Sequence, residues 1–228
     1  MNNQITIHGL DDQPEKPANN RGLIRHLPNA LTVLRILLAP VLYWMILAAN
    51  TYAEYVLLYY VFVIAGLTDI YDGKFARSHK TITTFGKVVD PVADKLILAA
   101  TLIPFYMLSH KVAIFRMVSF EVLVILLGRE LLITLLRYYA MWSGKVFSAS
   151  RLAKFKTAFQ MFFIGSVLVH LAHRKLIATH PAWSFQWFDS FHYKMNYVVI
   201  FVVVGLSIVS AVEYIARNVP ALARHSRT

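Results

Sequence analysis

The chain contains no cysteine and few charged residues. Of its 228 residues only 15% are Asp, Glu, Lys or Arg, whereas a soluble globular protein carries about 25%. The absence of thiols excludes disulfides and thiolate metal sites. Apolar residues make up 57% of the chain, and the mean hydropathy is +0.53. These values indicate one polytopic membrane domain rather than one or two soluble domains.

Acidic residues are the scarcer charged type, and this imbalance bears on the binding partners. There are 12 Asp and Glu against 23 Lys and Arg, which gives a formal net charge of +11. Such a charge suits either nucleic acid or a surface for anionic lipid and phosphates. Because it accompanies long apolar segments, we expect membrane lipid and phosphates as partners, and no nucleic acid. The polar start of the chain, with Asp11, Asp12 and Glu15, is unlike a signal peptide.

Long apolar segments predict an all-α membrane protein with six transmembrane helices. The expected spans are 29–49, 52–78, 85–108, 115–142, 151–171 and 195–216. The expected organisation is a polar, flexible N-terminus at 1–20, an interfacial segment at 21–28, a six-helix catalytic membrane domain at 29–217 with an aromatic-rich loop at 172–194, and a basic tail at 218–228. A plain linker is the alternative for 21–28. Six spans put both termini on one side, and the Lys and Arg bias of the loops favours the cytoplasm.

Four aspartates, Asp69, Asp72, Asp90 and Asp94, lie where the second and third spans meet. Spacings of three and four residues place each pair on one helix face. An Asp in a membrane span costs about 3 kcal/mol, so four together require a function. Carboxylates without Cys or convergent His favour hard divalent ions such as Mg²⁺ or Mn²⁺. Such ions would neutralise a substrate diphosphate and activate a leaving phosphate.

Small residues and one cation lie between the aspartates. Gly73 and Gly86 leave room for a ligand to approach the backbone, and Ala76 is also small. Arg77 lies one turn beyond Gly73 and can pair with a phosphate. The stretch therefore predicts a pocket that combines metal ions, an opening without side chains and a cation.

A second basic group lies on the fourth and fifth spans toward the same face. Its members are Arg129, Arg137, Lys154 and Lys156. Buried cations need partners, and pairing within the protein, with Glu130 or the aspartates, is one interpretation. Capture of an anionic, phosphorylated substrate beside the metals is the other, and we favour it because only Glu130 is a neighbouring acid. At the start of the first span, Asn29, Thr32 and Arg35 form a polar stripe, or else an N-cap with a snorkelling arginine.

The aspartate stretch carries a signature, D-x2-D-G-x2-A-R-x8-G-x3-D-x3-D, with every spacing met from Asp69 to Asp94. It resembles the CDP-alcohol phosphotransferase family. Four further segments resemble the bacterial phosphatidylglycerophosphate synthases of that family: PNALTVLRILLAP, DPVADKL, GRELLITLLR and SASRLAKFKTAFQM. Together they cover most of residues 28–161.

The resemblance implies a six-helix, homodimeric enzyme of the bacterial inner membrane, with its site facing the cytoplasm and both termini cytoplasmic. It implies two ions, Mg²⁺ or Mn²⁺, held by the four aspartates, with Asp94 also the general base. The substrates would be CDP-diacylglycerol and glycerol 3-phosphate, giving phosphatidylglycerophosphate and CMP in phospholipid biosynthesis. The resemblance places CDP-diacylglycerol against Asn29, Thr32, Gly73, Ala76, Arg77, Thr83 and Gly86.

The basic group then becomes the binding site for the phosphate of the acceptor. An acceptor without phosphate, such as serine, would not need four cations. Another alcohol, such as inositol phosphate, stays open as the acceptor. A divalent-cation or proton-coupled carrier is the alternative of a different class, but the polar residues crowd one face, and no internal repeat is visible.

Overall fold

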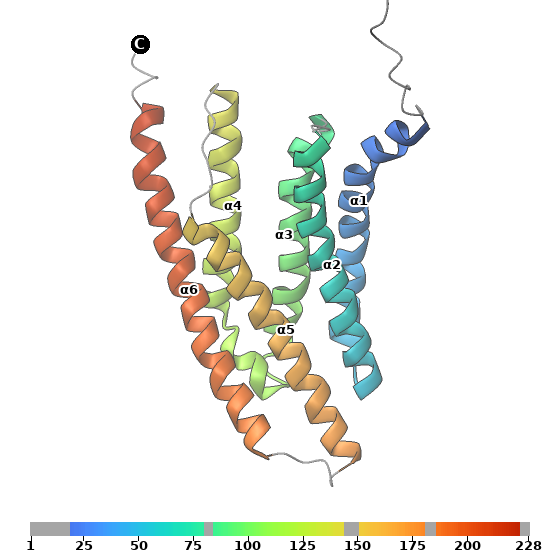
Figure 1. The fold of residues 1–228 in the computed structure, drawn as a ribbon. Coiled ribbons are helices and arrows are strands. Elements are labelled where there is room, and N and C mark those ends of the chain that lie inside the picture. Colours follow the sequence, from blue (N-terminus) through green and yellow to red (C-terminus); the bar gives the residue numbers. More distant parts are fainter. Residues whose placement is uncertain (1–18, 80–83, 144–150, 181–185, 224–228) are drawn as a thin grey trace, which may run out of the picture.

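The computed structural model describes residues 19–79, 84–143, 151–180 and 186–223. Within them, the described side chains are those of 30–68, 89, 92–143, 152–180 and 187–218. In these parts of the chain the secondary structure is wholly helical. The elements are α1 (Asn19–Ala48), α2 (Tyr52–His79), α3 (Thr84–Met107), η1 (Ala113–Met117), α4 (Phe120–Trp142), α5 (Arg151–Thr179) and α6 (Gln186–Ala223) (Figure 1).

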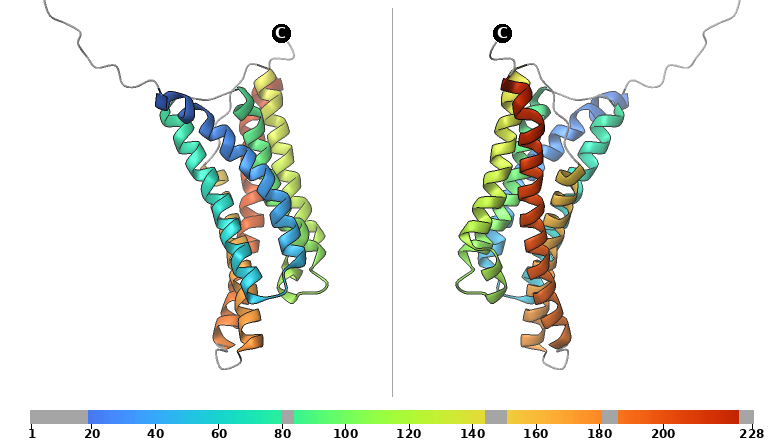
Figure 2. Two further views of the ribbon diagram at one scale, coloured as in Figure 1. Left: turned by 90° about the vertical axis from the view of Figure 1, so that its right-hand side faces the viewer. Right: turned by 90° about the vertical axis from the view of Figure 1, so that its left-hand side faces the viewer.

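The helices form one bundle whose two halves diverge toward the end where α1 begins and α6 ends. α1 packs against α2 and α3, while α5 packs against α2 and α6, and α4 against α3 and α6. In Figure 2 the helices lie close together at the lower end and splay apart toward the upper end. Leu42, Leu58 and Phe163 are fully buried in the core, where Phe105 stacks on Phe115 with ring centroids 4.6 Å apart. Among the described side chains, the main apolar core therefore lies in the lower part of the bundle.

Local sequence explains where two of the helices begin. At the start of α2, Thr51 Oγ1 accepts a hydrogen bond from Glu54 N, and Glu54 Oε2 accepts one from Thr51 N at 3.0 Å. This reciprocal pair satisfies free N–H groups of the first turn. At the start of α4, Ser119 Oγ accepts a hydrogen bond from Val122 N. This N-cap makes α4 begin at Phe120, five residues later than the hydrophobic run predicts, and the apolar residues before it form η1.

Three helical stretches are long and apolar enough to cross a membrane. Among the described residues these are Ala30–Ala48, Leu152–Thr179 and Trp187–Asn218, and Tyr52–Thr68 is a shorter apolar stretch. The chain therefore has the composition of an integral membrane protein. α4 does not meet the same standard, because it carries Arg129, Glu130 and Arg137 within 23 residues. The six helices are present, and six membrane crossings stay a prediction.

The predicted loop at 172–194 is wrong. α5 continues to Thr179 and α6 already begins at Gln186, so most of this segment is helical. The fall in hydropathy marks where polar side chains begin, not where the helices end. The start of α6 lies against the end of α5 here: Asp189 lies 3.5 Å from His170 Nε2 and 3.9 Å from Arg174 Nε.

The segment 21–28 is helical and belongs to α1, which begins at Asn19. Figure 1 shows the first turns of α1 running obliquely to the rest of the helix. Pro28 lies inside the helix, where its missing N–H favours such a bend. The segment is therefore helical, and both its position at a membrane surface and the linker alternative stay untested predictions. Residues 1–18 and 224–228 lie outside the described part of the chain.

Candidate active site

Asp94 on α3 forms an ion pair with Arg35 on α1. The Arg35 side chain is only 2% exposed, whereas that of Asp94 is 41% exposed. Arg35 therefore does not snorkel toward solvent, and the alternative that explained it in this way is wrong. A guanidinium is held in a buried position most readily when a carboxylate compensates its charge. The pair fixes the side of α3 that carries Asp94 against α1, which agrees with the close packing of these two helices.

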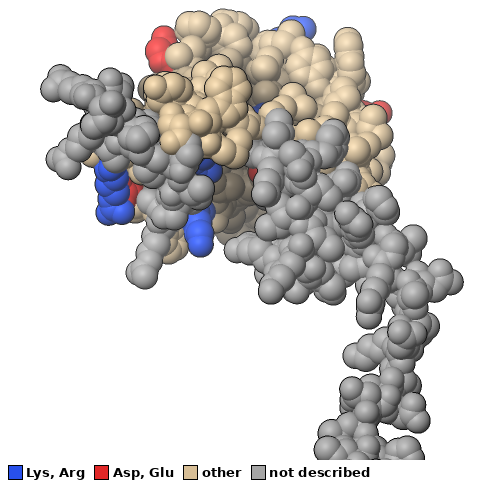
Figure 3. Space-filling view, turned by 90° about the horizontal axis from the view of Figure 1, so that it is seen from above, with Lys and Arg blue, Asp and Glu red and all other residues tan. Residues whose placement is uncertain are grey.

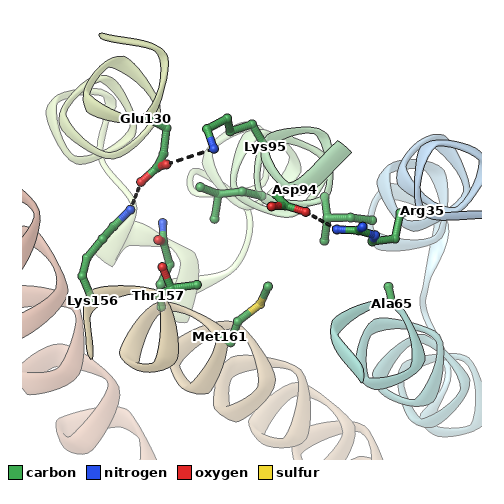
Figure 4. A pocket seen from close by; sticks show the side chains of 11 residues that line it. Arg35, Ala65, Asp94, Lys95, Glu130, Lys156, Thr157 and Met161 are labelled. Atoms are coloured by element: carbon green, nitrogen blue, oxygen red, sulfur yellow. Dashed lines mark hydrogen bonds and ion pairs between the residues drawn. The ribbon is translucent and has the colours of Figure 1, made fainter. Parts of the chain in front are cut away.

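Glu130 on α4 is the centre of a second group of charges (Figure 4). Its Oε1 atom accepts hydrogen bonds from Lys156 Nζ on α5 and from Arg129 Nη1, the latter at 3.0 Å. Lys95 Nζ on α3 lies 3.6 Å from Glu130 Oε2. Lys156 is 1% exposed, and Arg129 also donates to Ser210 Oγ on α6 at 2.9 Å. One carboxylate therefore joins α3, α4 and α5, and three cations share it.

Two adjoining cavities lie between these groups. The smaller, of about 110 Å³, is lined by Arg35, Asp94, Lys95, Glu130, Lys156 and Gln160, among others. The larger, of about 490 Å³, shares several of these residues and adds Gly66, Arg129, Arg137, Thr134 and Lys154. Seen from above in Figure 3, Lys and Arg side chains gather beside a recess at this end of the molecule.

Cations outnumber carboxylates among the described residues that line the two cavities. The carboxylates are Asp94 and Glu130, and both are already paired with cations. Arg137 has its guanidinium carbon 5.7 Å from the centre of the Tyr214 ring, and Lys154 is exposed. The excess of positive charge attracts an anion, and a phosphate is the ligand that Arg recognises best by paired hydrogen bonds.

The structure brings the predicted basic group together. Arg129, Arg137 and Lys154 line the larger cavity, and Lys156 lines the smaller one. The predicted pairing with Glu130 holds for Arg129 and Lys156, and the capture of a phosphorylated substrate stays a prediction.

Most of the predicted metal and nucleotide residues lie outside the described side chains. Asp69, Asp72, Gly73, Ala76 and Arg77 are on α2, and Gly86 and Asp90 are on α3, while Thr83 lies between these helices in a segment that is not described. Asn29 is on α1 without a described side chain. Asp94 is described above, and Thr32 is 1% exposed on α1, the helix that also carries Arg35. Within the described side chains no three His, Asp or Glu residues gather as a metal site.

Sequence reasoning gave no role to three residues of the smaller cavity, Lys95, Thr157 and Gln160. Gln160 and Lys156 are four residues apart on α5 and share a buried face. A buried polar pair at this spacing in an apolar helix is the signal by which Gln160 could have been found. Lys95 follows Asp94 directly and gave no such pattern.

Comparison with known proteins agrees with this arrangement. The sequence profile of the CDP-alcohol phosphatidyltransferase family matches residues 25–209. The chain therefore belongs to the CDP-alcohol phosphatidyltransferase family, a membership that favours a transferase over a carrier.

Three relatives that carry the same name illustrate the similarity. A CDP-diacylglycerol–glycerol-3-phosphate 3-phosphatidyltransferase of Bacillus subtilis is 29% identical over 208 residues, which covers 86% of this chain and 97% of the relative. Proteins of the same name from Rickettsia typhi and Wigglesworthia glossinidia brevipalpis are 36% and 34% identical. These two matches cover 64% and 63% of this chain, and 78% and 76% of the relatives.

Proposed function

We propose that this protein transfers the phosphatidyl group of CDP-diacylglycerol to sn-glycerol 3-phosphate and releases CMP. The observation that carries the proposal is the cationic pair of cavities beside Asp94. The proposed donor is an anionic nucleotide lipid, and the proposed acceptor is a second anion that must be held beside it. A phosphorylated acceptor accounts for the excess of cations, and the names of the relatives support the same acceptor.

The proposed reaction is a single displacement at phosphorus. The oxygen of the primary hydroxyl of glycerol 3-phosphate forms a bond to the phosphorus that carries diacylglycerol. The bond from that phosphorus to the bridging oxygen breaks, and CMP leaves with the electron pair. Asp94 accepts the proton of the attacking hydroxyl, and its partial exposure to the cavity suits this role. Arg35 holds the Asp94 side chain in place during the transfer.

We further propose that Asp69, Asp72, Asp90 and Asp94 hold divalent ions, Mg²⁺ or Mn²⁺. The carboxylate of Asp94 is an oxygen donor with part of its surface exposed, and oxygen donors are the ligands these ions prefer. Asp90 lies on α3 together with Asp94, and Asp69 and Asp72 lie on α2. When bound, such ions supply charge neutralisation for the diphosphate and the leaving CMP.

The donor and acceptor are assigned to different residues. CDP-diacylglycerol is proposed to contact Asn29, Thr32, Gly73, Ala76, Arg77, Thr83 and Gly86. The phosphate of glycerol 3-phosphate is proposed to bind at the larger cavity, where Arg129, Arg137 and Lys154 converge, with Lys156 next to it. These cations come from two helices, α4 and α5, so the phosphate would join elements that are otherwise linked through Glu130 and Lys156.

The proposed setting is the bacterial inner membrane, with the site and both termini on the cytoplasmic side and with two copies forming a homodimer. The first turn of α1 and the last turn of α6 lie at the same end of the bundle as the charged cavities, which supports one common side (Figure 1). The mass of the purified protein in detergent tests the homodimer.

The reaction is tested with purified protein, Mg²⁺ or Mn²⁺, CDP-diacylglycerol and labelled glycerol 3-phosphate. We expect release of CMP, and a loss of about 10²- to 10⁴-fold in turnover for Asp94→Asn. Glu121→Gln is the control, because Glu121 is an exposed carboxylate at the opposite end of the bundle. Comparison of glycerol 3-phosphate with inositol phosphate, serine and phosphatidylglycerol tests the acceptor. Full turnover of Asp94→Asn would refute the role of Asp94.

A further inference from the structure

The proposed reaction assigns no role to the side-chain amide of Gln160 on α5. The side chain is 3% exposed, and its Nε2 atom has no hydrogen-bond partner among the described residues. A buried amide without a partner costs free energy, and native structures seldom keep one without a reason. The position therefore needs an explanation.

Gln160 is one of the residues that line the smaller cavity, and its Nε2 atom is itself buried. The cavity has a volume of about 110 Å³, and its polar lining consists, among the described residues, of Gln160 and of Arg35, Asp94, Lys95, Glu130, Lys156 and Thr157. One water molecule needs only about 10–15 Å³ of such volume, so the space can admit a larger polar group. The remaining lining includes Ala65, Ile97, Leu98 and Met161, which offer no strong hydrogen-bond partner. Several side chains can therefore bind a polar guest, and Gln160 is the neutral amide among them.

We infer that Gln160 recognises the second-carbon hydroxyl of the acceptor and makes the site selective for a vicinal diol phosphate. The inference rests on the proposed function. The amide nitrogen donates a hydrogen bond to the hydroxyl that does not react, while the primary hydroxyl lies at Asp94. Gln160 thereby differs from the cations, which hold the phosphate, and from Asp94, which handles the reacting proton.

The geometry of α5 supports this division of roles. Lys156 and Gln160 are one helical turn apart on the same buried face, and a turn rises about 5.4 Å. That rise is comparable to the reach of a three-carbon phosphate from its anionic group to its hydroxyls. Thr157 follows Lys156, Met161 follows Gln160, and both line the two cavities. The carbon chain of the acceptor, between its phosphate and its hydroxyls, can therefore pass from one cavity to the other.

The experiment compares two acceptors that differ in one group. sn-Glycerol 3-phosphate carries the second hydroxyl, and 3-hydroxypropyl phosphate has the same phosphate and primary hydroxyl but lacks it. The measured quantity is the ratio of kcat/KM for the two acceptors, taken within each variant so that differences in the amount of folded protein cancel. For the unaltered protein we expect a ratio of at least about five, because the analogue leaves a buried donor without a partner.

Gln160→Leu removes the amide at similar volume, and the ratio should then fall to near one. The fall should come from glycerol 3-phosphate, whose KM rises, while the analogue keeps its kcat/KM. Gln160→Met serves the same purpose if the Leu variant does not fold. Ser166→Ala is the matched control, since Ser166 is also buried on α5 and its Oγ has no partner in the described part of the chain, but it does not line the cavity.

Three results would overturn the inference. A ratio near one in the unaltered protein would mean that the second hydroxyl is not recognised. An equal loss for both acceptors in the Gln160 variants would mean that the residue has a structural role only. An unchanged ratio in those variants would assign the recognition to another group. A failure of the proposed function would give a fourth, distinguishable result: the unaltered protein would release no CMP with glycerol 3-phosphate.

Discussion

Glu130 offers the sharpest test of how the charged centre is built. Its carboxylate accepts hydrogen bonds from Lys156 and Arg129 and lies 3.6 Å from Lys95. Glu130→Gln keeps the shape of the side chain and removes the negative charge. Lys156 is 1% exposed and cannot turn to solvent without moving α5. The variant therefore leaves a buried ammonium without its counter-charge.

The expected cost follows from this burial. Removing one partner of a buried ion pair destabilises a protein by about 3–5 kcal/mol. We expect the lower end of this range, because the Gln oxygen still accepts one hydrogen bond and Glu130 is 15% exposed. For a chain of this size, about 3 kcal/mol corresponds to a fall in Tm of about 6–12 °C. Activity should fall as well, since the same cations face the proposed phosphate site.

Thermal unfolding in detergent measures the effect, with Glu213→Gln as the matched control. Glu213 pairs with Arg217 at 2.9 Å, but Arg217 is 71% exposed, so this pair should contribute only about 0.3–0.5 kcal/mol. Lys156→Met added to Glu130→Gln removes the unpaired ammonium and should recover at least half of the lost stability. A Tm of Glu130→Gln equal to that of the Glu213 control, or no recovery in the double variant, would refute the reasoning.

Three further predictions concern the substrate groups. Lys154→Ala should raise the KM for glycerol 3-phosphate about tenfold with little change in Tm, because Lys154 is exposed and faces the larger cavity; an unchanged KM would remove it from the phosphate site. Arg35→Met should lower kcat about 10- to 100-fold, as expected for the loss of a charge-assisted hydrogen bond to Asp94, with Arg35→Lys retaining part of the rate; an unchanged kcat in Arg35→Met would mean that the ion pair has no role in turnover. A chelator should abolish CMP release, and Mg²⁺ or Mn²⁺ should restore it; turnover that persists in the chelator would contradict the metal proposal.

The helices and the reaction class could be predicted from residues alone, because both depend on local pattern. Long apolar runs indicate helices because a segment inside the membrane must satisfy its own backbone hydrogen bonds. The fixed spacing of the aspartates places each pair on one helix face. The limits of this reasoning appear at the segment 172–194. Its polar and aromatic residues end the apolar run, yet α5 and α6 both extend into this segment, where Asp189 lies near His170 and Arg174.

Partners far apart in the sequence required the tertiary structure. The sequence by itself determined that the chain is helical and apolar, that it belongs with phosphatidyl transfer chemistry, and that cations gather on two of its helices. Only the fold decided that Arg35 pairs with Asp94, 59 residues away, and that Glu130 gathers cations from three helices. Gln160 was likewise identified by the cavity it lines. The physical reason is that the spacing of residues in the sequence reveals which face of a helix a side chain lies on, whereas its charge partner depends on which helices pack together.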